Sequence, residues 1–185
     1  MQLASDRLGF LATLAALCLS FGGAGCAATT VRVPIAEGSS ETRETQKLDC
    51  GVYDERTKSL TVGLSFSALF GAAAAGPYVT SAESAGVKWE KAAQLVVAQY
   101  KEVCARYNAG AISQPSYDGR ISEIDQLYAE AQGIRASADS VIRGHSKEAF
   151  ADLDKNTDGP AGDQVAQAQQ VVSSVEVFYV KVGGQ

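Results

Sequence analysis

The sequence has few of the residues on which enzymes and nucleic-acid-binding proteins depend. Its 185 residues include one histidine, and 16 lysines and arginines against 21 aspartates and glutamates, for a net charge of −5. Without a basic cluster to neutralise phosphates, we expect no nucleic-acid partner. The sequence has no nucleophile motif such as Gly-x-Ser-x-Gly with which His145 could act. The glycines at the two ends of segment 71–76 are not followed by the lysine of a phosphate-binding loop. Neighbouring carboxylates such as Glu123 and Asp125 are expected to form a solvated helix face, so the sequence predicts a non-enzymatic protein.

Long hydrophobic runs are also scarce. The segment 8–21, LGFLATLAALCLSF, is an apolar run of about 14 residues. A membrane-spanning helix needs about 20 such residues, whereas the core of a signal peptide needs fewer. We therefore interpret residues 1–25 as a signal peptide. A Ser- and Gly-rich run at 60–75 leaves a second membrane element open.

The residues after the apolar run carry a first resemblance. The sequence GAGC at 23–26 resembles the lipobox of bacterial lipoproteins, with glycine in place of the usual leucine at its first position. The resemblance implies that Cys26 becomes the acylated first residue, and three acyl chains would anchor it stably in a membrane. Because Ala27 rather than aspartate follows the cysteine, the resemblance further implies that the protein is sorted to the outer membrane and faces the periplasm. The uncharacterised envelope lipoproteins of bacteria are the group that it indicates.

Two alternatives to lipidation stay open. Ordinary cleavage near Ala24 or Ala28 would give a secreted or soluble periplasmic protein, and an uncleaved segment would itself be the anchor. In the lipidated form, residues 26–47 are polar and low in large apolar side chains, which is typical of a flexible tether. Residues 48–185 then form a single globular domain.

Cysteine usage agrees with export. Of the four cysteines, Cys18 leaves with the signal peptide and Cys26 takes the lipid, which leaves Cys50 and Cys104. An even pair in an oxidising compartment predicts a disulfide, and closing a loop of that size contributes roughly 4 kcal/mol in the chain-entropy model. Two buried free thiols are the alternative. Two cysteines and one histidine do not make a standard zinc site without carboxylates.

The middle of the chain has a helical period. Its large side chains recur at spacings of three and four, which predicts packed helices over about 84–109 and 114–155 and an antiparallel helical hairpin between them. Gly110 is the expected stop of the first helix and Ser113 the N-cap of the second, while Gly133 and Gly144 are weak points within the second helix. The predicted core positions are Trp89, Ala93, Val96, Tyr100, Val103, Tyr107, Tyr117, Ile121, Ile124, Tyr128, Ala131, Ile134, Ala138 and Ile142.

Two other segments have the pattern of strands. Residues 58–68 alternate apolar and small polar side chains, and residues 175–182 are rich in valine and aromatic residues. Since each strand alone would leave an unpaired edge, we expect the two to pair. The predicted fold class is mainly α with a small β component.

The turn between the helices carries a second, local resemblance. Residues 107–128 are similar to the short helical hairpin module called SHOCT, through Gly110, Ile112, Ser113, Tyr117 and Arg120. Pro115 and Gly119 stand where that module usually has strong helix formers. The resemblance implies a helical hairpin and no reaction.

One stretch has the beginning of a calcium loop. Asp154, Asn156 and Asp158 occupy ligand positions 1, 3 and 5 of an EF-hand, and Gly159 occupies the turn. Position 12 is Val165, where a bidentate glutamate should complete the shell. The alternative is a polar turn at the end of a helix. Calcium is thus the one cofactor that the sequence suggests.

These observations predict a non-enzymatic, membrane-anchored envelope lipoprotein. Its helical hairpin would be a spacer or a docking surface for another envelope protein. The alternative is a periplasmic calcium-binding module centred on residues 154–159.

Overall fold

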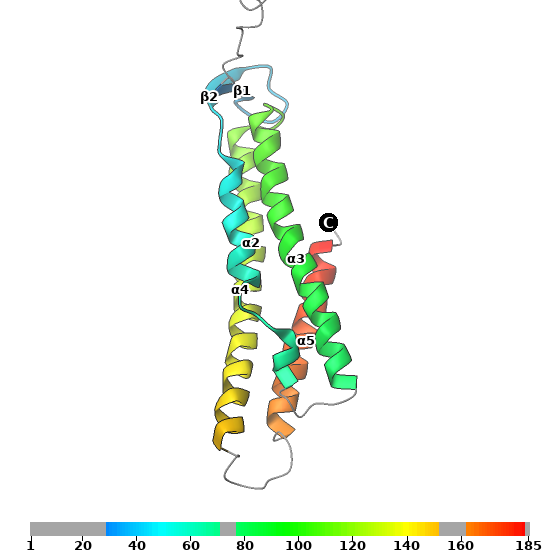
Figure 1. Ribbon diagram of the computed structural model, residues 1–185. Coiled ribbons are helices and arrows are strands. Elements are labelled where there is room, and N and C mark those ends of the chain that lie inside the picture. Colours follow the sequence, from blue (N-terminus) through cyan, green and yellow to red (C-terminus); the bar gives the residue numbers. More distant parts are fainter. Residues whose placement is uncertain (1–28, 71–76, 152–161, 184–185) are drawn as a thin grey trace, which may run out of the picture.

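The computed structural model describes residues 29–70, 77–151 and 162–183 (Figure 1). Within them the chain is mainly helical, with one small antiparallel sheet, so the predicted fold class is confirmed. The elements in chain order are β1 (Thr30–Pro34), β2 (Thr42–Gln46), the 3-10 helix η1 (Cys50–Tyr53), α2 (Asp54–Thr61), the 3-10 helix η2 (Phe66–Phe70), α3 (Pro77–Asn108), α4 (Gln114–Ala151) and α5 (Gly162–Gly183).

The two long helices α3 and α4 form the predicted antiparallel hairpin (Figure 1). Their apolar seams meet, and the side chains of Trp89, Tyr100 and Tyr107 from α3 are almost wholly buried. The second helix continues through Gly133 and Gly144, the two weak points of its sequence. A glycine costs a helix only about 1 kcal/mol, which tertiary packing along 38 residues outweighs.

The turn between α3 and α4 follows the predicted signals. Gly110 has a positive φ of 69°, and its N–H donates to the Tyr107 carbonyl while the Ala111 N–H donates to the Arg106 carbonyl. This is the Schellman pattern that ends a helix at a left-handed glycine. Ser113 is buried and its hydroxyl accepts from the Ser116 N–H at 3.4 Å, so the predicted cap is confirmed.

The predicted strand at 175–182 is wrong, because this segment is the last part of helix α5. Its buried side chains recur with a helical period, and the β-prone residues that broke this period, Val177 and Val180, point to solvent. Packing of a helical face against α3 and α4 overrides the intrinsic β preference of valine. The buried residues of α5 are Ala168, Val171, Val172, Val175, Phe178 and Val182.

The predicted strand at 58–68 is also wrong, because α2 and η2 occupy these residues. Two carbonyls at the end of α2 are satisfied by side chains instead of a neighbouring strand. The Trp89 indole donates to the Leu60 carbonyl at 3.2 Å and the Arg135 guanidinium donates to the Val62 carbonyl at 2.9 Å. A positive φ at Gly63 then turns the chain into η2.

The small sheet lies instead within the segment that we expected to be a flexible tether. Strands β1 and β2 pair antiparallel, with Thr30 opposite Gln46 and Pro34 opposite Thr42. Val33 is buried, and the backbone at Arg32 lies against Gly110 in the turn between the long helices. The sheet therefore caps the end of the α3–α4 hairpin (Figure 1).

The bundle has two halves that differ in the third element packed on α3 and α4 (Figure 1). In what we call the hairpin half, this element is α2, together with η1 and the sheet. In the α5 half, it is α5, together with η2. Trp89 is central to the core of the α5 half, with its ring centroid 6.1 Å from that of Phe66 and 6.2 Å from that of Phe178.

No helix among residues 29–70, 77–151 and 162–183 combines the length and the apolar character needed to cross a membrane.

Candidate functional site

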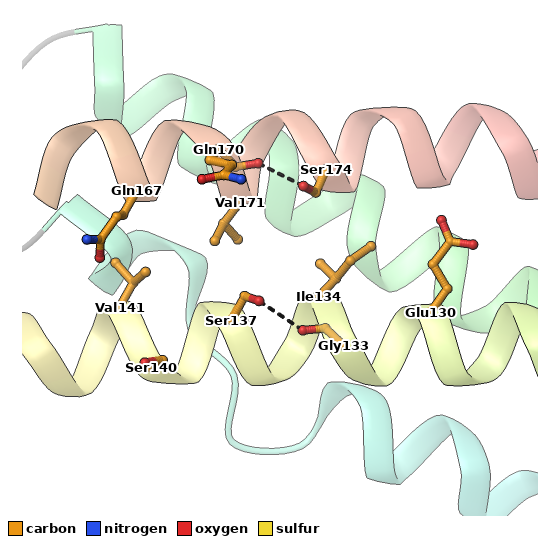
Figure 2. A pocket seen from close by; sticks show the side chains of 10 residues that line it. All are labelled: Glu130, Gly133, Ile134, Ser137, Ser140, Val141, Gln167, Gln170, Val171 and Ser174. Atoms are coloured by element: carbon orange, nitrogen blue, oxygen red, sulfur yellow. Dashed lines mark hydrogen bonds between the residues drawn. The ribbon is translucent and has the colours of Figure 1, made fainter. Parts of the chain in front are cut away.

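The described part of the bundle has an open groove between α4 and α5, which we call the α4–α5 groove (Figure 2). Its volume is about 500 Å³. Ile134 and Val141 from α4 and Val171 from α5 point into it and form an apolar strip. The other lining residues are polar or small, namely Glu130, Gly133, Ser137, Ser140, Gln167, Gln170 and Ser174.

The groove exists because small side chains face each other where two helices pack. Gly133, Ser137 and Ser140 on α4 leave space that larger residues at the same positions would fill. No described atom outside the helix backbone lies within 4 Å of the position that a Cβ on Gly133 would take.

Two of the three serine hydroxyls that line the groove donate a hydrogen bond to a carbonyl of their own helix. The Ser137 hydroxyl donates to the Gly133 carbonyl at 3.1 Å and the Ser174 hydroxyl donates to the Gln170 carbonyl at 2.9 Å (Figure 2). A hydroxyl oxygen that donates in this way keeps its lone pairs. The groove can therefore accept hydrogen bonds from a bound group, while the amides of Gln167 and Gln170 can also donate.

One end of the groove is marked by an ion pair between the helices. The Lys181 ammonium of α5 lies 2.5 Å from the Glu130 carboxylate of α4. Because these two charges pair, the groove offers no unpaired ionic group from its lining residues. Its chemistry suits an uncharged and partly apolar surface.

The hairpin half contains a second candidate, the Arg56 cluster, made of Arg56, Tyr53, Tyr100, Tyr128 and Asp125. The guanidinium carbon of Arg56 lies 5.5, 4.4 and 5.0 Å from the ring centroids of Tyr53, Tyr100 and Tyr128. The rings of Tyr53 and Tyr100 stack at 4.7 Å. Three aromatic rings around one cation resemble the cages that bind cationic ligands, but here the cation belongs to the protein.

Hydrogen bonds close the Arg56 cluster. The Arg56 guanidinium donates to the Asp125 carboxylate at 2.6 Å and to the Tyr100 hydroxyl, which in turn donates to the same carboxylate at 2.5 Å. The Tyr128 hydroxyl shares a hydrogen bond of 2.5 Å with that of Ser59. The cluster thereby links α2 to both long helices, and we interpret it as a structural cross-link.

The electrostatics of the cluster follow from this arrangement. Partial burial works to raise the pKa of the Asp125 carboxyl, but hydrogen bonds from Tyr100 and Arg56 and the charge of Arg56 outweigh it, so that pKa is lowered. Burial and the hydrogen bond to Asp125 raise the pKa of the Tyr100 hydroxyl well above its usual value. At neutral pH the cluster therefore contains an Arg56–Asp125 ion pair beside an uncharged Tyr100 hydroxyl.

The predicted disulfide between Cys50 and Cys104 is confirmed, with the two Cα atoms 5.8 Å apart. It ties η1 to α3. Beside it, the Asn108 side chain makes two hydrogen bonds of 2.8 Å with the backbone of Leu48, donating to its carbonyl and accepting from its N–H. The chain that follows the sheet is therefore held to the end of α3 covalently and by hydrogen bonds.

Most of the other site residues predicted from the sequence lie outside the part of the chain that the structure describes. Cys26 lies outside the described residues, as do Asp154, Asn156 and Asp158, so acylation and calcium binding stay predictions. His145 lies in α4. Within the part of the chain that the structure describes, no three His, Cys, Asp or Glu side chains come close enough to hold a metal ion.

Sequence reasoning missed the α4–α5 groove and the Arg56 cluster. Asp125 lies on an exposed helix face, as predicted, but the sequence did not reveal that it also binds Arg56 and Tyr100. A signal for the cluster was present, because buried tyrosine hydroxyls need hydrogen-bond partners. The small residues on α4 were a weaker signal, because predicting a groove also requires knowing which helix packs opposite them.

Comparison with known proteins adds no assignment. No family model, curated protein or solved structure matches the chain.

Proposed function

We propose that the chain is a non-enzymatic lipoprotein of the bacterial envelope and that its helical bundle is a docking module for another envelope protein. The GAGC sequence at 23–26 supports an anchor at Cys26, in the outer membrane and facing the periplasm. The observation that carries the docking role is the α4–α5 groove. Its place on two long helices gives a partner a rigid surface.

The shape of the groove favours a helix as the bound element. Along α4 it extends from Glu130 to Val141, which at about 1.5 Å per residue corresponds to about 16 Å, or three helical turns. An amphipathic helix can lie in such a groove with its apolar residues on the strip formed by Ile134, Val141 and Val171. The serine and glutamine side chains on either side favour uncharged polar neighbours on that helix.

Site-specific cross-linking tests the docking role. A photo-reactive amino acid at Ser140, inside the groove, should cross-link to one envelope protein in intact cells. The same amino acid at Ser173, which is exposed on α5 outside the groove, is the matched control. A Ser137→Trp substitution should abolish the cross-link by filling the groove, whereas Ser173→Trp should leave it unchanged. Equal cross-linking from both positions, or no effect of Ser137→Trp, would contradict docking in the groove.

Intact-mass measurement of protein extracted from membranes tests the anchor. The expected species begins at Cys26 and carries the added mass of its acyl chains. An unmodified mature chain that begins at another residue would refute the lipoprotein assignment while leaving the cross-linking result to stand independently.

A further inference from the structure

We propose that the capped end of the bundle, formed by the sheet and the residues after it, rests on the surface of the phospholipid bilayer. Ile35 and Leu48 would enter the interfacial region, and the α4–α5 groove would be held away from the membrane. This inference rests on the proposed acylation of Cys26. It adds an orientation that the anchor by itself does not define.

The short connection between the anchor and the sheet limits how far the sheet can lie from the membrane. Thr29 is already fixed to the sheet, since its carbonyl accepts from the Lys47 N–H at 2.8 Å. From Cys26 to Thr29 there are three residue steps, which span at most roughly 11 Å even when fully extended. The polar region of one bilayer leaflet is itself about 5 to 8 Å thick. The sheet must therefore lie at the membrane surface.

Two exposed apolar side chains at this end of the bundle, those of Ile35 and Leu48, support contact with the bilayer. Ile35 is 52% exposed in the turn between β1 and β2, and Leu48 is 38% exposed just after β2. The Asn108 side chain holds the Leu48 backbone at the end of α3. Glu37, in the same turn as Ile35, accepts from the Ser116 hydroxyl in the first turn of α4. Both apolar side chains thus belong to the end of the bundle from which the anchor leaves.

The charges at this end favour apolar contact over attraction to anionic lipids. Three basic and four acidic residues are interspersed between positions 30 and 49, namely Arg32, Arg43 and Lys47 against Glu37, Glu41, Glu44 and Asp49. A polybasic segment would bind anionic headgroups, but this segment has no basic excess. Isolated large apolar side chains gain from burial at the acyl boundary whatever the headgroup charge.

This orientation determines where the groove lies. Glu130, at its near end, comes 16 residues after Gln114, the first residue of α4. At 1.5 Å per residue the groove begins about 24 Å from the capped end. Because α4 runs away from that end (Figure 1), the groove lining from Glu130 to Val141 extends away from it as well. A partner in the periplasm could then reach the groove without touching the bilayer.

Fluorescence quenching by brominated lipids tests the contact on the full lipidated protein. It is reconstituted in vesicles of phosphatidylethanolamine and phosphatidylglycerol, and tryptophan is introduced by Ile35→Trp or Leu48→Trp. The natural Trp89 is buried and supplies a constant background. Vesicles with brominated acyl chains should quench the added tryptophan in both variants. Val177→Trp is the control, since Val177 is 67% exposed on α5, and it should not be quenched.

Hydroxyl-radical footprinting of the unsubstituted protein gives an independent measurement. In vesicles, Ile35 and Leu48 should be oxidised far less than Val177 and Val180, after normalisation to the unfolded chain. Oxidation of all four in proportion to their exposed fractions would overturn the proposal, as would equal quenching of the three tryptophan variants. If intact mass shows acyl chains in the same sample, the anchor survives that failure. A sample without acyl chains that does not bind vesicles overturns both.

Discussion

The two halves of the bundle share α3 and α4 but are held together by different chemistry. In the hairpin half, a disulfide, the Asn108 hydrogen bonds and the Arg56 cluster join the outer elements to the long helices. In the α5 half, valine and alanine side chains pack across the helices, with ion pairs at Lys88–Glu176 and Lys181–Glu130 on the surface. The hairpin half is therefore held together mainly by a covalent bond and polar contacts, and the α5 half mainly by apolar packing.

The difference shows how the same pair of helices can provide both rigidity and a binding surface. Large tyrosines fill the space beside α2, and their hydroxyls are paired within the protein. Small residues beside α5 leave the groove, and polar atoms there remain able to accept hydrogen bonds. We therefore expect substitutions in the hairpin half to change stability and substitutions along the groove to change docking.

The largest expected effect is the loss of the disulfide. Replacing both Cys50 and Cys104 by alanine should lower the free energy of unfolding by about 4 kcal/mol, because the bond closes a loop with a sequence separation of 54 residues. Urea unfolding followed by circular dichroism measures the change. Unfolding of the wild-type protein under a thiol reductant is the control and should reproduce the variant. A loss below about 1 kcal/mol in both would show that the non-covalent contacts of this half suffice.

The next largest effect is expected at the turn. A Gly110→Ala substitution should destabilise the protein by about 3 kcal/mol, because the positive φ is strained for alanine and the added Cβ would overlap the carbonyl oxygen of Arg32. Gly119→Ala is the matched control on α4, where the added methyl group would meet no described side chain. It should not lower the urea midpoint. Equal urea midpoints for the Gly110→Ala and Gly119→Ala variants would mean that the close contact between the sheet and the turn does not restrict residue 110.

The Arg56 cluster should contribute more than an ion pair of the α5 half. Arg56→Ala should lower the free energy of unfolding by about 2 kcal/mol, since it removes contacts to three rings and the guanidinium donor to both Asp125 and Tyr100. Lys88→Ala removes a side chain with the same exposed fraction, 34%, from its pair with Glu176. We expect a loss of about 0 to 1 kcal/mol there. Similar losses in the two variants would contradict the distinction between the halves.

The same cluster should make stability depend on acidic pH. Because the pKa of Asp125 is lower in the folded protein than in the unfolded chain, its contribution is present above the unfolded pKa of about 4. That contribution is lost as the pH falls through the lower folded pKa. Asp125→Asn removes it at every pH, so the difference in urea midpoint between wild type and variant should shrink below pH 4. A difference that stays constant from pH 7 to pH 2 would contradict the ion pair.

The sequence was sufficient where a local signal and the tertiary environment agree. The seam from Trp89 to Tyr107, the stop at Gly110 and the cap at Ser113 are each determined by a few neighbouring residues, and all are present. The disulfide was predictable because the expected export would leave only Cys50 and Cys104 in the domain. The two predicted strands failed because alternation over a few residues does not reveal what packs on them.

The groove and the Arg56 cluster depend on contacts between residues far apart in the chain. Arg56 and Asp125 are 69 positions apart, and their pairing follows from where α2 docks. The segment 26–47 appeared too polar to fold, yet β1 and β2 pair with each other and bury Val33 against the bundle. A polar hairpin of this kind is stabilised by the surface that it covers, which no pattern within it shows.

The smallest expected effect lies in the groove and separates stability from docking. Gly133→Ala should raise the free energy of unfolding by about 0.5 to 1 kcal/mol, because alanine is the better helix former and the added methyl group has room. Gly144→Ala, also on α4 but outside the groove lining, should stabilise by a similar amount. Only Gly133→Ala should weaken cross-linking from position 140, since its methyl group narrows the groove. If both variants stabilise the protein and neither weakens the cross-link, the groove has no part in docking and the α5 half is simply a packed support.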